Sequence, residues 1–391
     1  RNILNFEKDF PEARVIVLDE NYRSTQTILE GANAVISRNI FQKPKLLWTQ
    51  NSAGEKIECV ILPTGEGEAE CVSGEIVRLI GEGRPREDIA VLYRTNAQSR
   101  GIEESLLSKN IPYTLIGGTK FYQRKEVKDI VGYLRVIINP NDRLAIKRII
   151  NIPPRGIGAI TFLKYLESLE GKTPSQTGKG GEQTRAFEQC IQELRTDAEM
   201  LSPSLLIRTV IKKIKYEEYL EDAFLDAESR IENLRELENL AARFNGENTA
   251  EELSRMLEEI SLASDADEAE KKDKKGITLM TLHAAKGLEF PIVFIVGMEE
   301  GLFPHSKSLF DPASLEEERR LCYVGLTRAK EKVWLTRAYR RRVWGDHQIN
   351  SPSRFLKEIP EHLLNITDTA GAVEFLKGND DEYEDDELPF E

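Results

Sequence analysis

The chain has 391 residues, a formal net charge of −13 and 40% hydrophobic residues. This length exceeds one typical hydrophobic core, so we expect two or more domains. No CxxC pair, no metal-ligand spacing among the four histidines and no apolar run long enough for a membrane span occur in the sequence. These absences argue against a disulfide framework and a membrane protein, and they predict reduced thiols in a cytoplasmic protein.

The acidic charge is concentrated in short segments. Asp265–Glu270 precedes a basic run, and Asp380–Glu387 lies in the segment 367–391, whose composition predicts a disordered acidic tail. A negative net charge counts against nucleic-acid binding, because contacts with phosphates dominate that affinity. A protein that follows a single strand needs only a local basic groove and stacking groups, so the net charge does not exclude DNA.

The first 122 residues alternate apolar strand patterns with amphipathic helix patterns. This alternation predicts an α/β fold with a parallel sheet and crossover helices. The predicted strands are Arg14–Leu18, Ile57–Leu62, Ile89–Tyr93 and Tyr113–Ile116. The predicted helices are Gln26–Ser37, Glu68–Gly81 and Gln98–Lys109.

The first predicted strand runs directly into a polar turn. Ligand groups collect at the carboxyl ends of strands in open α/β sheets. Tyr22 in this turn is either a platform for a base or a packing residue, and Arg23 is placed to reach a phosphate. Ser24 or Thr25 is a candidate cap for the helix that follows.

A second polar turn follows the strand Ile89–Tyr93. Arg94 and Asn96 open a helix there, and the N-terminus of a helix favours a phosphate. Two interpretations remain open from the residues alone. Either both side chains contact a nucleic acid, or Asn96 caps the helix and Arg94 is solvated.

Residues 123–275 show helical patterns with almost no strand signal. Examples are Val127–Ile138, Leu144–Ile150, Ile160–Leu169, Leu205–Ile214 and Ala227–Arg243. Within this block, Gly156 and Gly158 lie in a turn between two helices, where backbone amides without a neighbouring Cβ can approach a DNA phosphate. The alternative is a plain glycine turn between packed helices.

Strand patterns return at Ile277–Thr281 and Pro291–Val296, both continuous apolar runs typical of a parallel sheet. In the connection between them, His283 and Lys286 are placed to contact a phosphate backbone, and Glu289 to hold a ribose hydroxyl. Lys286 also suits the C-terminal end of a helix that Gly287 caps, and both interpretations can hold together. The return of strands predicts an inserted helical domain, with boundaries 1–122, 123–275 and 276–366.

The segment Glu317–Lys330 predicts an amphipathic helix that ends close to Arg328. We expect Gly325 to loosen the helix just before this arginine. A guanidinium can bond two phosphate oxygens at once, so Arg328 could act as an arginine finger on a nucleoside triphosphate. The alternative is a surface helix with a solvated arginine.

Three segments taken together resemble the UvrD/PcrA/Rep group of superfamily 1 DNA helicases. They are Tyr22–Ser24, Thr281–His305 and Glu316–Lys330, which resemble motifs IV, V and VI of that family. The resemblance implies a RecA-like (P-loop NTPase-type) α/β domain with a parallel sheet and an inserted all-helical domain, called 2A and 2B in the family. It implies an ATP-dependent 3′→5′ DNA helicase that binds single-stranded and duplex DNA in repair or replication.

The same resemblance implies roles for single residues. Tyr22 would stack on adenine, Glu289 would hold the ribose, and Arg23 and Arg328 would be the catalytic contacts to the γ-phosphate. His305 would couple the nucleotide site to DNA. The residues that would contact DNA are Arg94, Asn96, His283 and Lys286 on the single strand, and Gly156 and Gly158 at the duplex.

A P-loop is missing from the sequence. The only Gly-Lys-Thr is Gly171-Lys172-Thr173, and Leu166 occupies the position where the motif needs its first glycine. In this family a second part of the site is a paired Asp-Glu that serves Mg²⁺ and the activation of water. In the family these parts lie upstream, and Arg1–Phe6 resembles the sequence directly after motif III.

We therefore expect the C-terminal part of a longer helicase. ATP would be its substrate, the ligands of Mg²⁺ would lie in a missing N-terminal RecA-like domain, and that domain would be its partner, without which it is inactive. The competing hypothesis is a non-catalytic DNA-binding or protein-interaction module.

Overall fold

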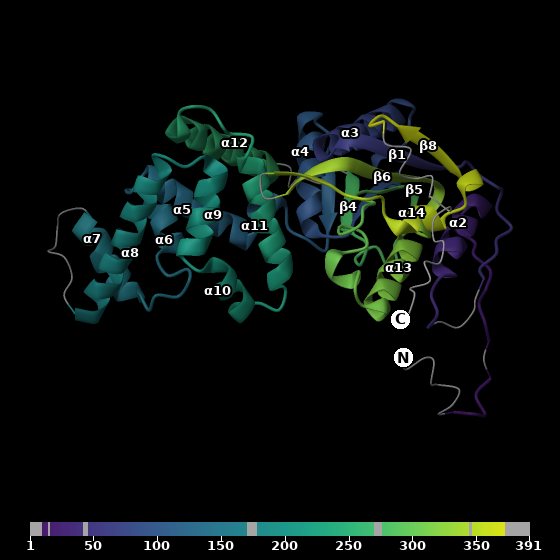
Figure 1. Cartoon of the computed structure of the whole chain (residues 1–391), viewed down its shortest axis with the longest axis horizontal. Helices are drawn as coiled ribbons and strands as arrows, with labels where there is room; N and C mark the ends of the chain where they lie inside the picture. The colour runs from purple at the N-terminus through teal and green to yellow at the C-terminus, as the bar shows by residue number, and fades with distance from the viewer. Residues whose placement is uncertain are drawn as a thin grey trace, which may run out of the picture. The chain divides into compact units, whose positions relative to one another are not determined.

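The computed structural model describes residues 10–14, 16–41, 46–169, 178–269, 276–343 and 346–371 (Figure 1). The chain divides into two compact units. Unit 1 comprises Arg1–Arg94, Thr281–Arg341 and Ile349–Glu391, and unit 2 comprises Thr95–Met280 and Arg342–Gln348. Gly171–Thr173 and the acidic segment Asp380–Glu387 lie outside the described residues.

Unit 1 contains a parallel sheet in the order β2-β5-β6-β1-β8. Its strands are β1 (Ile57–Thr64), β2 (Ile89–Tyr93), β5 (Phe290–Ile295), β6 (Ala329–Val343) and β8 (Leu364–Asp368). Its α-helices are α2 (Gln26–Ile36), α3 (Gly65–Gly81), α13 (Pro312–Leu326) and α14 (Arg354–Glu358). Its 3₁₀ helices are η1 (Arg86–Asp88), η4 (Ser306–Ser308) and η5 (Glu361–Leu363).

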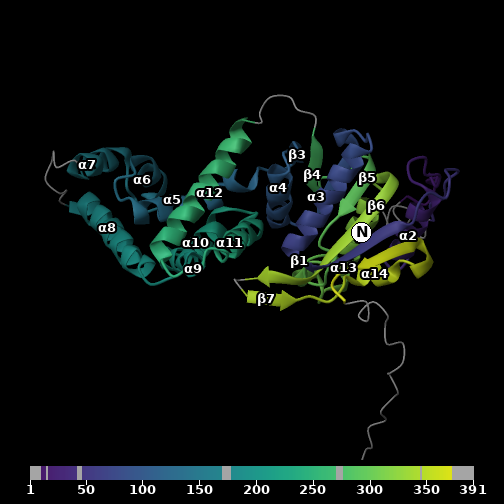
Figure 2. The ribbon, with the colours of Figure 1, turned by 90° about the horizontal axis from the view of Figure 1, so that it is seen from above.

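Helices cover both faces of this sheet, as the continuous apolar strand patterns predict. All five residues of β2 are buried. Helix α3 lies on one side of the strands, and α13, with α2 and α14 beside it, lies on the other (Figures 1 and 2). Glu68 of α3 is buried and accepts hydrogen bonds from Gly297 N at 2.9 Å and from Thr336 Oγ1 at 2.7 Å, which fixes α3 to the sheet.

Unit 2 is mainly helical. Its α-helices are α4 (Ser99–Ser108), α5 (Lys125–Ile138), α6 (Arg143–Ile149), α7 (Ala159–Leu169), α8 (Gly178–Ala198), α9 (Pro203–Lys213), α10 (Tyr216–Ala223), α11 (Ala227–Ala241) and α12 (Thr249–Ala269). Two 3₁₀ helices, η2 (Asn96–Gln98) and η3 (Phe121–Gln123), lie at its start. Strand β3 (Tyr113–Ile116) pairs in parallel with β4 (Ile277–Thr281), and the short β7 (Asp346–Ile349) pairs with β6.

The apolar faces of helices α5 to α12 meet in one core. Asp129 is fully buried within it, where Tyr216 Oη donates a hydrogen bond and Lys125 forms an ion pair, both at 2.7 Å. These partners satisfy a buried charge that would otherwise be costly. Phe121 of η3 is 1% exposed and also belongs to this core.

The prediction of an α/β fold with a parallel sheet and a helical block is confirmed. The predicted domain boundaries stay a prediction; the compact units divide after Arg94 and after Met280, so β3 and most of β4 fall with the helices. Among the described residues, no helix combines the length and apolar composition that a membrane crossing requires.

The predicted strand Arg14–Leu18 is wrong, because Arg14 and Ile16–Leu18 form no strand. Val15 lies outside the described residues. Ile16, Val17 and Leu18 are 72%, 57% and 79% exposed. The first pairing beyond them is the isolated bridge between Glu20 and Trp48. An apolar run becomes a strand only where a neighbouring strand completes its backbone hydrogen bonds, and the sequence pattern does not reveal whether such a neighbour is present.

Candidate nucleotide and DNA site

Arg23 and Glu289 form an ion pair in unit 1. Arg23 Nε donates to Glu289 Oε2 at 2.6 Å, and Arg23 Nη1 donates to the carbonyl oxygen of Thr327 at 3.3 Å. Lys330 Nζ lies 2.8 Å from the other oxygen of Glu289. The hydrogen bonds from Lys330 and then Arg23 lower the pKa of Glu289 to about 2. Sequence reasoning missed Lys330, whose charge alone gives no signal of this contact.

Arg328 lies two residues after the end of α13. Its Nε donates to the carbonyl oxygen of Val324 at 3.0 Å, and its Nη1 donates to that of Leu288 at 3.1 Å. Burial lowers the pKa of the guanidinium, and the positive charge of Arg23 lowers it further. Arg328 is therefore a half-buried, hydrogen-bonded arginine beside Arg23, and the alternative of a solvated arginine is wrong.

The expectation that Gly325 loosens the helix is also wrong, because α13 continues to Leu326 and Gly325 is buried. A Cβ at Gly325 would lie 2.6 Å from Leu282 Cδ2 and 3.0 Å from Ile295 Cδ1. The glycine permits close packing of α13 against β5 and against the turn that follows β4. That close approach sets the position of Arg328.

Tyr22 projects from the surface beside this cluster. Its side chain is 78% exposed, and its hydroxyl donates to Glu20 Oε2 at 2.8 Å, which raises its pKa. This exposure excludes the packing alternative. Thr25 occupies the N-cap position of α2 without a side-chain cap bond, and Ser24 Oγ donates instead to the carbonyl oxygen of Ala329 at 2.7 Å. Neither residue caps the helix through its side chain.

The side chains gathered here suit an anion. Three cations, Arg23, Arg328 and Lys330, surround one carboxylate, Glu289. Guanidinium and ammonium groups bind phosphate oxygens. Mg²⁺ needs oxygen ligands, and the one carboxylate of this group is already bound by two cations, so these residues do not fit that metal.

Arg94 lies directly after β2 and is bound by a buried carboxylate on α13. Its Nε lies 3.0 Å and 2.9 Å from the two oxygens of Glu318, and its Nη2 lies 2.7 Å from Oε1. The alternative of a solvated Arg94 is therefore wrong. Sequence reasoning did not single out Glu318, which is 3% exposed.

Asn96 belongs to unit 2, in η2. The N-cap of η2 is Thr95, not Asn96, and Thr95 N donates to Gln98 Oε1 at 2.9 Å in a capping box. The predicted cap at Asn96 is wrong by one residue, because the side chains of Thr95 and Gln98 satisfy the first backbone groups.

His283 and Lys286 lie on an exposed turn after β4. The turn contains no helix, so the interpretation of Lys286 as a helix-ending residue is wrong, although Gly287 does adopt a positive φ of 93°. Burial and the charge of Arg94 lower the pKa of His283 below its ordinary value of 6.5. In the chain without DNA, the imidazole of His283 is therefore mostly neutral at neutral pH.

His305 precedes η4 and is bound to the same carboxylate as Arg94. The backbone N–H of His305 donates to Glu318 Oε2 at 3.1 Å, and Ser308 Oγ lies 3.4 Å from Oε1. One buried carboxylate thus holds the end of β2 and the loop that carries His305.

Gly156 and Gly158 lie in unit 2, between α6 and α7. Gly156 has a φ of +72°, and a Cβ there would lie 2.6 Å from Gln183 Nε2, whereas a Cβ at Gly158 would meet open space. Asn151 Oδ1 accepts hydrogen bonds from the N–H groups of Arg155 and Ile157, which orders the turn. The positive φ and the nearby Gln183 therefore favour glycine at position 156, whereas a larger side chain could be accommodated at position 158.

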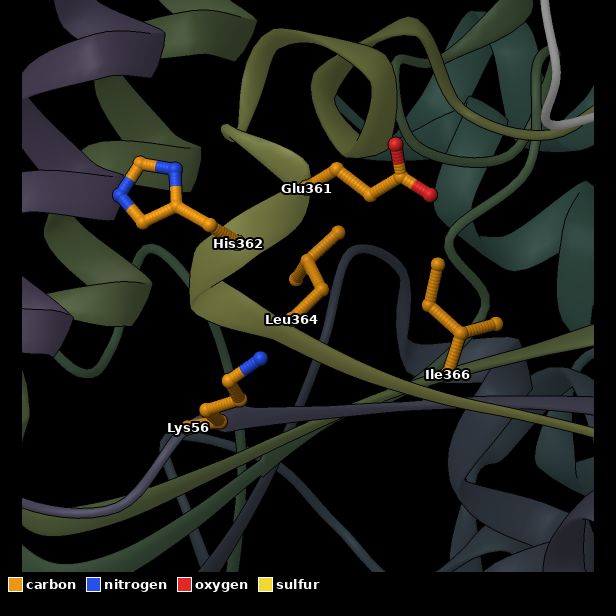
Figure 3. A pocket seen from close by; sticks show the side chains of 5 residues that line it. All are labelled: Lys56, Glu361, His362, Leu364 and Ile366. Carbon is orange, nitrogen blue, oxygen red and sulfur yellow. The ribbon is translucent and has the colours of Figure 1, made fainter.

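A separate hollow of about 470 Å³ lies at the far edge of the unit 1 sheet (Figure 3). It is lined by Lys56, Glu361, His362, Leu364 and Ile366. Figure 3 shows Leu364 and Ile366 on β8 between the charged ends of Lys56 and Glu361. None of these five residues belongs to the cluster around Glu289, so the hollow is not part of the candidate nucleotide site.

Comparisons with known proteins define the class. The UvrD-like helicase C-terminal domain family matches residues 16–340, and the chain belongs to this family. It is 44% identical over 382 residues to the ATP-dependent DNA helicase PcrA of Bacillus subtilis (strain 168). It is 45% identical over 381 residues to the PcrA of Staphylococcus aureus (strain NCTC 8325).

Both alignments cover 93% of this chain and 52% of the relative. The chain therefore spans about half the length of the curated relatives it matches. The resemblance of the three sequence motifs to this group of helicases is confirmed.

Proposed function

We propose that this chain is the C-terminal part of an ATP-dependent 3′→5′ DNA helicase. In this proposal it couples ATP hydrolysis to movement along single-stranded DNA and to duplex unwinding, in DNA repair or replication. It needs an N-terminal RecA-like domain for activity, and that domain supplies the ligands of Mg²⁺. The observation that carries the proposal is the cluster of Arg23, Arg328 and Glu289 beside the exposed ring of Tyr22.

ATP would bind with its base on Tyr22 and its γ-phosphate between Arg23 and Arg328. The charge that develops on the transferred phosphoryl group would be stabilised by the two guanidinium groups, which is the role of an arginine finger. Glu289 now bonds Arg23 through one oxygen, so the arriving phosphate would compete with this carboxylate for the guanidinium. Glu289 would then hold the ribose.

Movement on DNA would be driven by the binding and loss of the γ-phosphate at Arg23 and Arg328. Contacts that exist with ATP and not with ADP shift the equilibrium between a closed and an open arrangement of the two RecA-like halves. The proposed DNA contacts are Arg94, Asn96, His283 and Lys286 for the single strand, and Gly156 and Gly158 for the duplex. His305 would relay the state of the nucleotide site to the DNA.

The exposed apolar residues near the start of the chain support a domain partner. Ile16, Val17 and Leu18 are mostly exposed, and burying such side chains is favourable by about 1.5–3 kcal/mol each. We propose that the N-terminal RecA-like domain covers these three side chains in the complete protein. The chain's span of about half of its relatives is in keeping with such a partner.

The test combines this chain with the N-terminal part of the Bacillus subtilis relative that it does not cover. ATP hydrolysis that appears only in the mixture, and that single-stranded DNA stimulates, is the expected result. A folded, associated complex without hydrolysis would support the competing hypothesis, a non-catalytic DNA-binding or protein-interaction module.

A further inference from the structure

Glu318 occupies an unusual position for a carboxylate. It lies in the middle of α13 and is 3% exposed. A buried charge is costly unless it is paired and hydrogen-bonded, and here every partner comes from outside the helix. Those partners are Arg94, the backbone N–H of His305 and the hydroxyl of Ser308.

The partners belong to two segments with different proposed tasks. Arg94 directly follows β2 and is a proposed contact to single-stranded DNA. The His305 segment is proposed to relay the state of the nucleotide. Glu318 binds both through its two oxygens at distances of 2.7–3.1 Å. A displacement of either segment therefore changes the contacts of the same carboxylate.

Helix α13 connects Glu318 to the nucleotide site. Leu326, the last residue of the helix, lies eight positions further along, a rise of about 12 Å at 1.5 Å per residue. Arg328 lies two residues beyond Leu326, and its Nε donates to the carbonyl oxygen of Val324 on the same helix. The C-terminal end of α13 is also closely packed against the sheet, because Gly325 lies against Leu282. The N–H of Leu282 donates in turn to the carbonyl oxygen of Tyr93, the residue before Arg94, at 2.8 Å.

We propose that Glu318 is a positioning residue that couples the DNA-side residues Arg94 and His305 to the nucleotide-side Arg328 through α13. This inference rests on the proposed function and adds a residue to it. Glu318 touches neither ATP nor DNA in this proposal. Its charge fixes Arg94 and the His305 loop relative to the helix, so that DNA bound at one end changes the position of the arginine at the other.

The same helix offers a matched control. Arg319, the next residue, is bound by Glu358 of α14 through two hydrogen bonds of 3.0 Å and 2.7 Å, and both side chains are largely buried. This ion pair also anchors α13, but it contacts none of the proposed DNA or nucleotide residues. Glu358→Gln thus removes a comparable buried charge without touching the proposed path.

The experiment uses the complex of this chain with the N-terminal part of the Bacillus subtilis relative. The measured quantity is the ratio of ATP turnover at saturating single-stranded DNA to turnover without DNA. We expect Glu318→Gln to lower this ratio by at least about 10-fold, within the range of 5–150-fold found for couplings between two sites. The DNA concentration at half-stimulation should change much less, and Glu358→Gln should leave the ratio unchanged.

A ratio for Glu318→Gln equal to that of the wild type would overturn the inference. The inference would also be overturned if Glu318→Gln and Glu358→Gln lowered the turnover ratio and the melting temperature equally. Glu318 would then only support the fold. If Glu318→Gln does not fold, Glu318→Asp keeps the charge on a shorter side chain and should lower the ratio by about 5-fold. A wild-type complex without stimulation would refute the proposed function itself, before any variant is made.

Discussion

Arg23 and Glu289 are 266 positions apart in the sequence, yet Arg23 Nε lies 2.6 Å from Glu289 Oε2. The contact joins the turn before α2 to the turn before β5. A backbone hydrogen bond next to this ion pair holds the two segments together, since Thr25 N donates to the carbonyl oxygen of Lys330 at 3.2 Å. The two proposed γ-phosphate contacts, Arg23 and Arg328, are thus held on one continuous surface of unit 1.

Arg328→Ala should lower ATP turnover of the reconstituted complex by about 10³-fold or more, because it removes an arginine-finger charge. DNA binding should remain nearly intact, which a fluorescence anisotropy titration would show. Arg78→Ala, at an exposed arginine of α3, is the control and should turn over ATP like the wild type. Wild-type turnover in Arg328→Ala would remove this residue from the active site.

Glu289→Gln should change the acid stability of the isolated chain. The pKa of Glu289 falls from 4.5 to about 2 on folding, so its ion pairs contribute stability that is fully present above pH 4.5. That contribution is lost as the pH falls from 4.5 towards 2. Melting temperatures measured over this interval should fall more steeply for the wild type than for Glu289→Gln. Parallel curves would show that the carboxylate is not paired in solution.

His283 should titrate below 6.5 in the isolated chain, because burial and Arg94 disfavour its protonated form. A DNA phosphate beside the ring would favour the protonated form and raise this pKa. NMR titration of the imidazole, with and without single-stranded DNA, measures both values. An unchanged pKa at saturating DNA would argue against a phosphate contact at His283.

The two glycines of the α6–α7 turn should respond differently to alanine. Gly158→Ala meets open space, so it should keep the wild-type melting temperature and weaken binding to a duplex junction more than binding to a single strand. Gly156→Ala forces a Cβ onto a backbone with φ of +72° and should cost about 1 kcal/mol or more in the free energy of unfolding. Equal loss of junction and single-strand binding in Gly158→Ala would count against a specific duplex contact.

Gly325→Ala should destabilise unit 1 by about 1–3 kcal/mol, because the added methyl group overlaps Leu282 and Ile295. Chemical denaturation would measure this loss. Gly74→Ala, in α3, adds the same group where nothing lies within 4 Å, and it should leave the chain as stable as the wild type or more so. A neutral Gly325→Ala would show that α13 can shift away from the sheet without cost.

Much of the fold was predictable because its signals are local. The apolar runs of β1, β2 and β5 and the periodic helices of unit 2 lie within a few residues of their expected bounds. The strand predicted at Arg14–Leu18 failed, since a strand depends on a neighbour that its own pattern does not specify. The motif residues Arg23, Glu289 and Arg328 were identified as a set by their resemblance to a family.

The roles of Glu318 and Lys330 were not predictable in the same way. A charged residue in a charged stretch of sequence is normally solvated. Glu318 is buried with partners from other segments, among them Arg94, which is 224 positions away in the sequence. Lys330 likewise acquires its partner from another segment. Burial of charge is a property of the tertiary structure, and a single sequence without its partners carries almost no trace of it.

The hydrogen bond between Leu282 N and the carbonyl oxygen of Tyr93 has a consequence for how the chain can change over evolution. The chain leaves unit 1 after Arg94 and re-enters it at Thr281, so the exit and the re-entry are adjacent. A segment whose two ends meet can be lengthened, replaced or removed without reordering the strands on either side of it. Replacing the segment Thr95–Met280, which makes up most of unit 2, would therefore leave two neighbouring chain ends in unit 1 for a new segment to join.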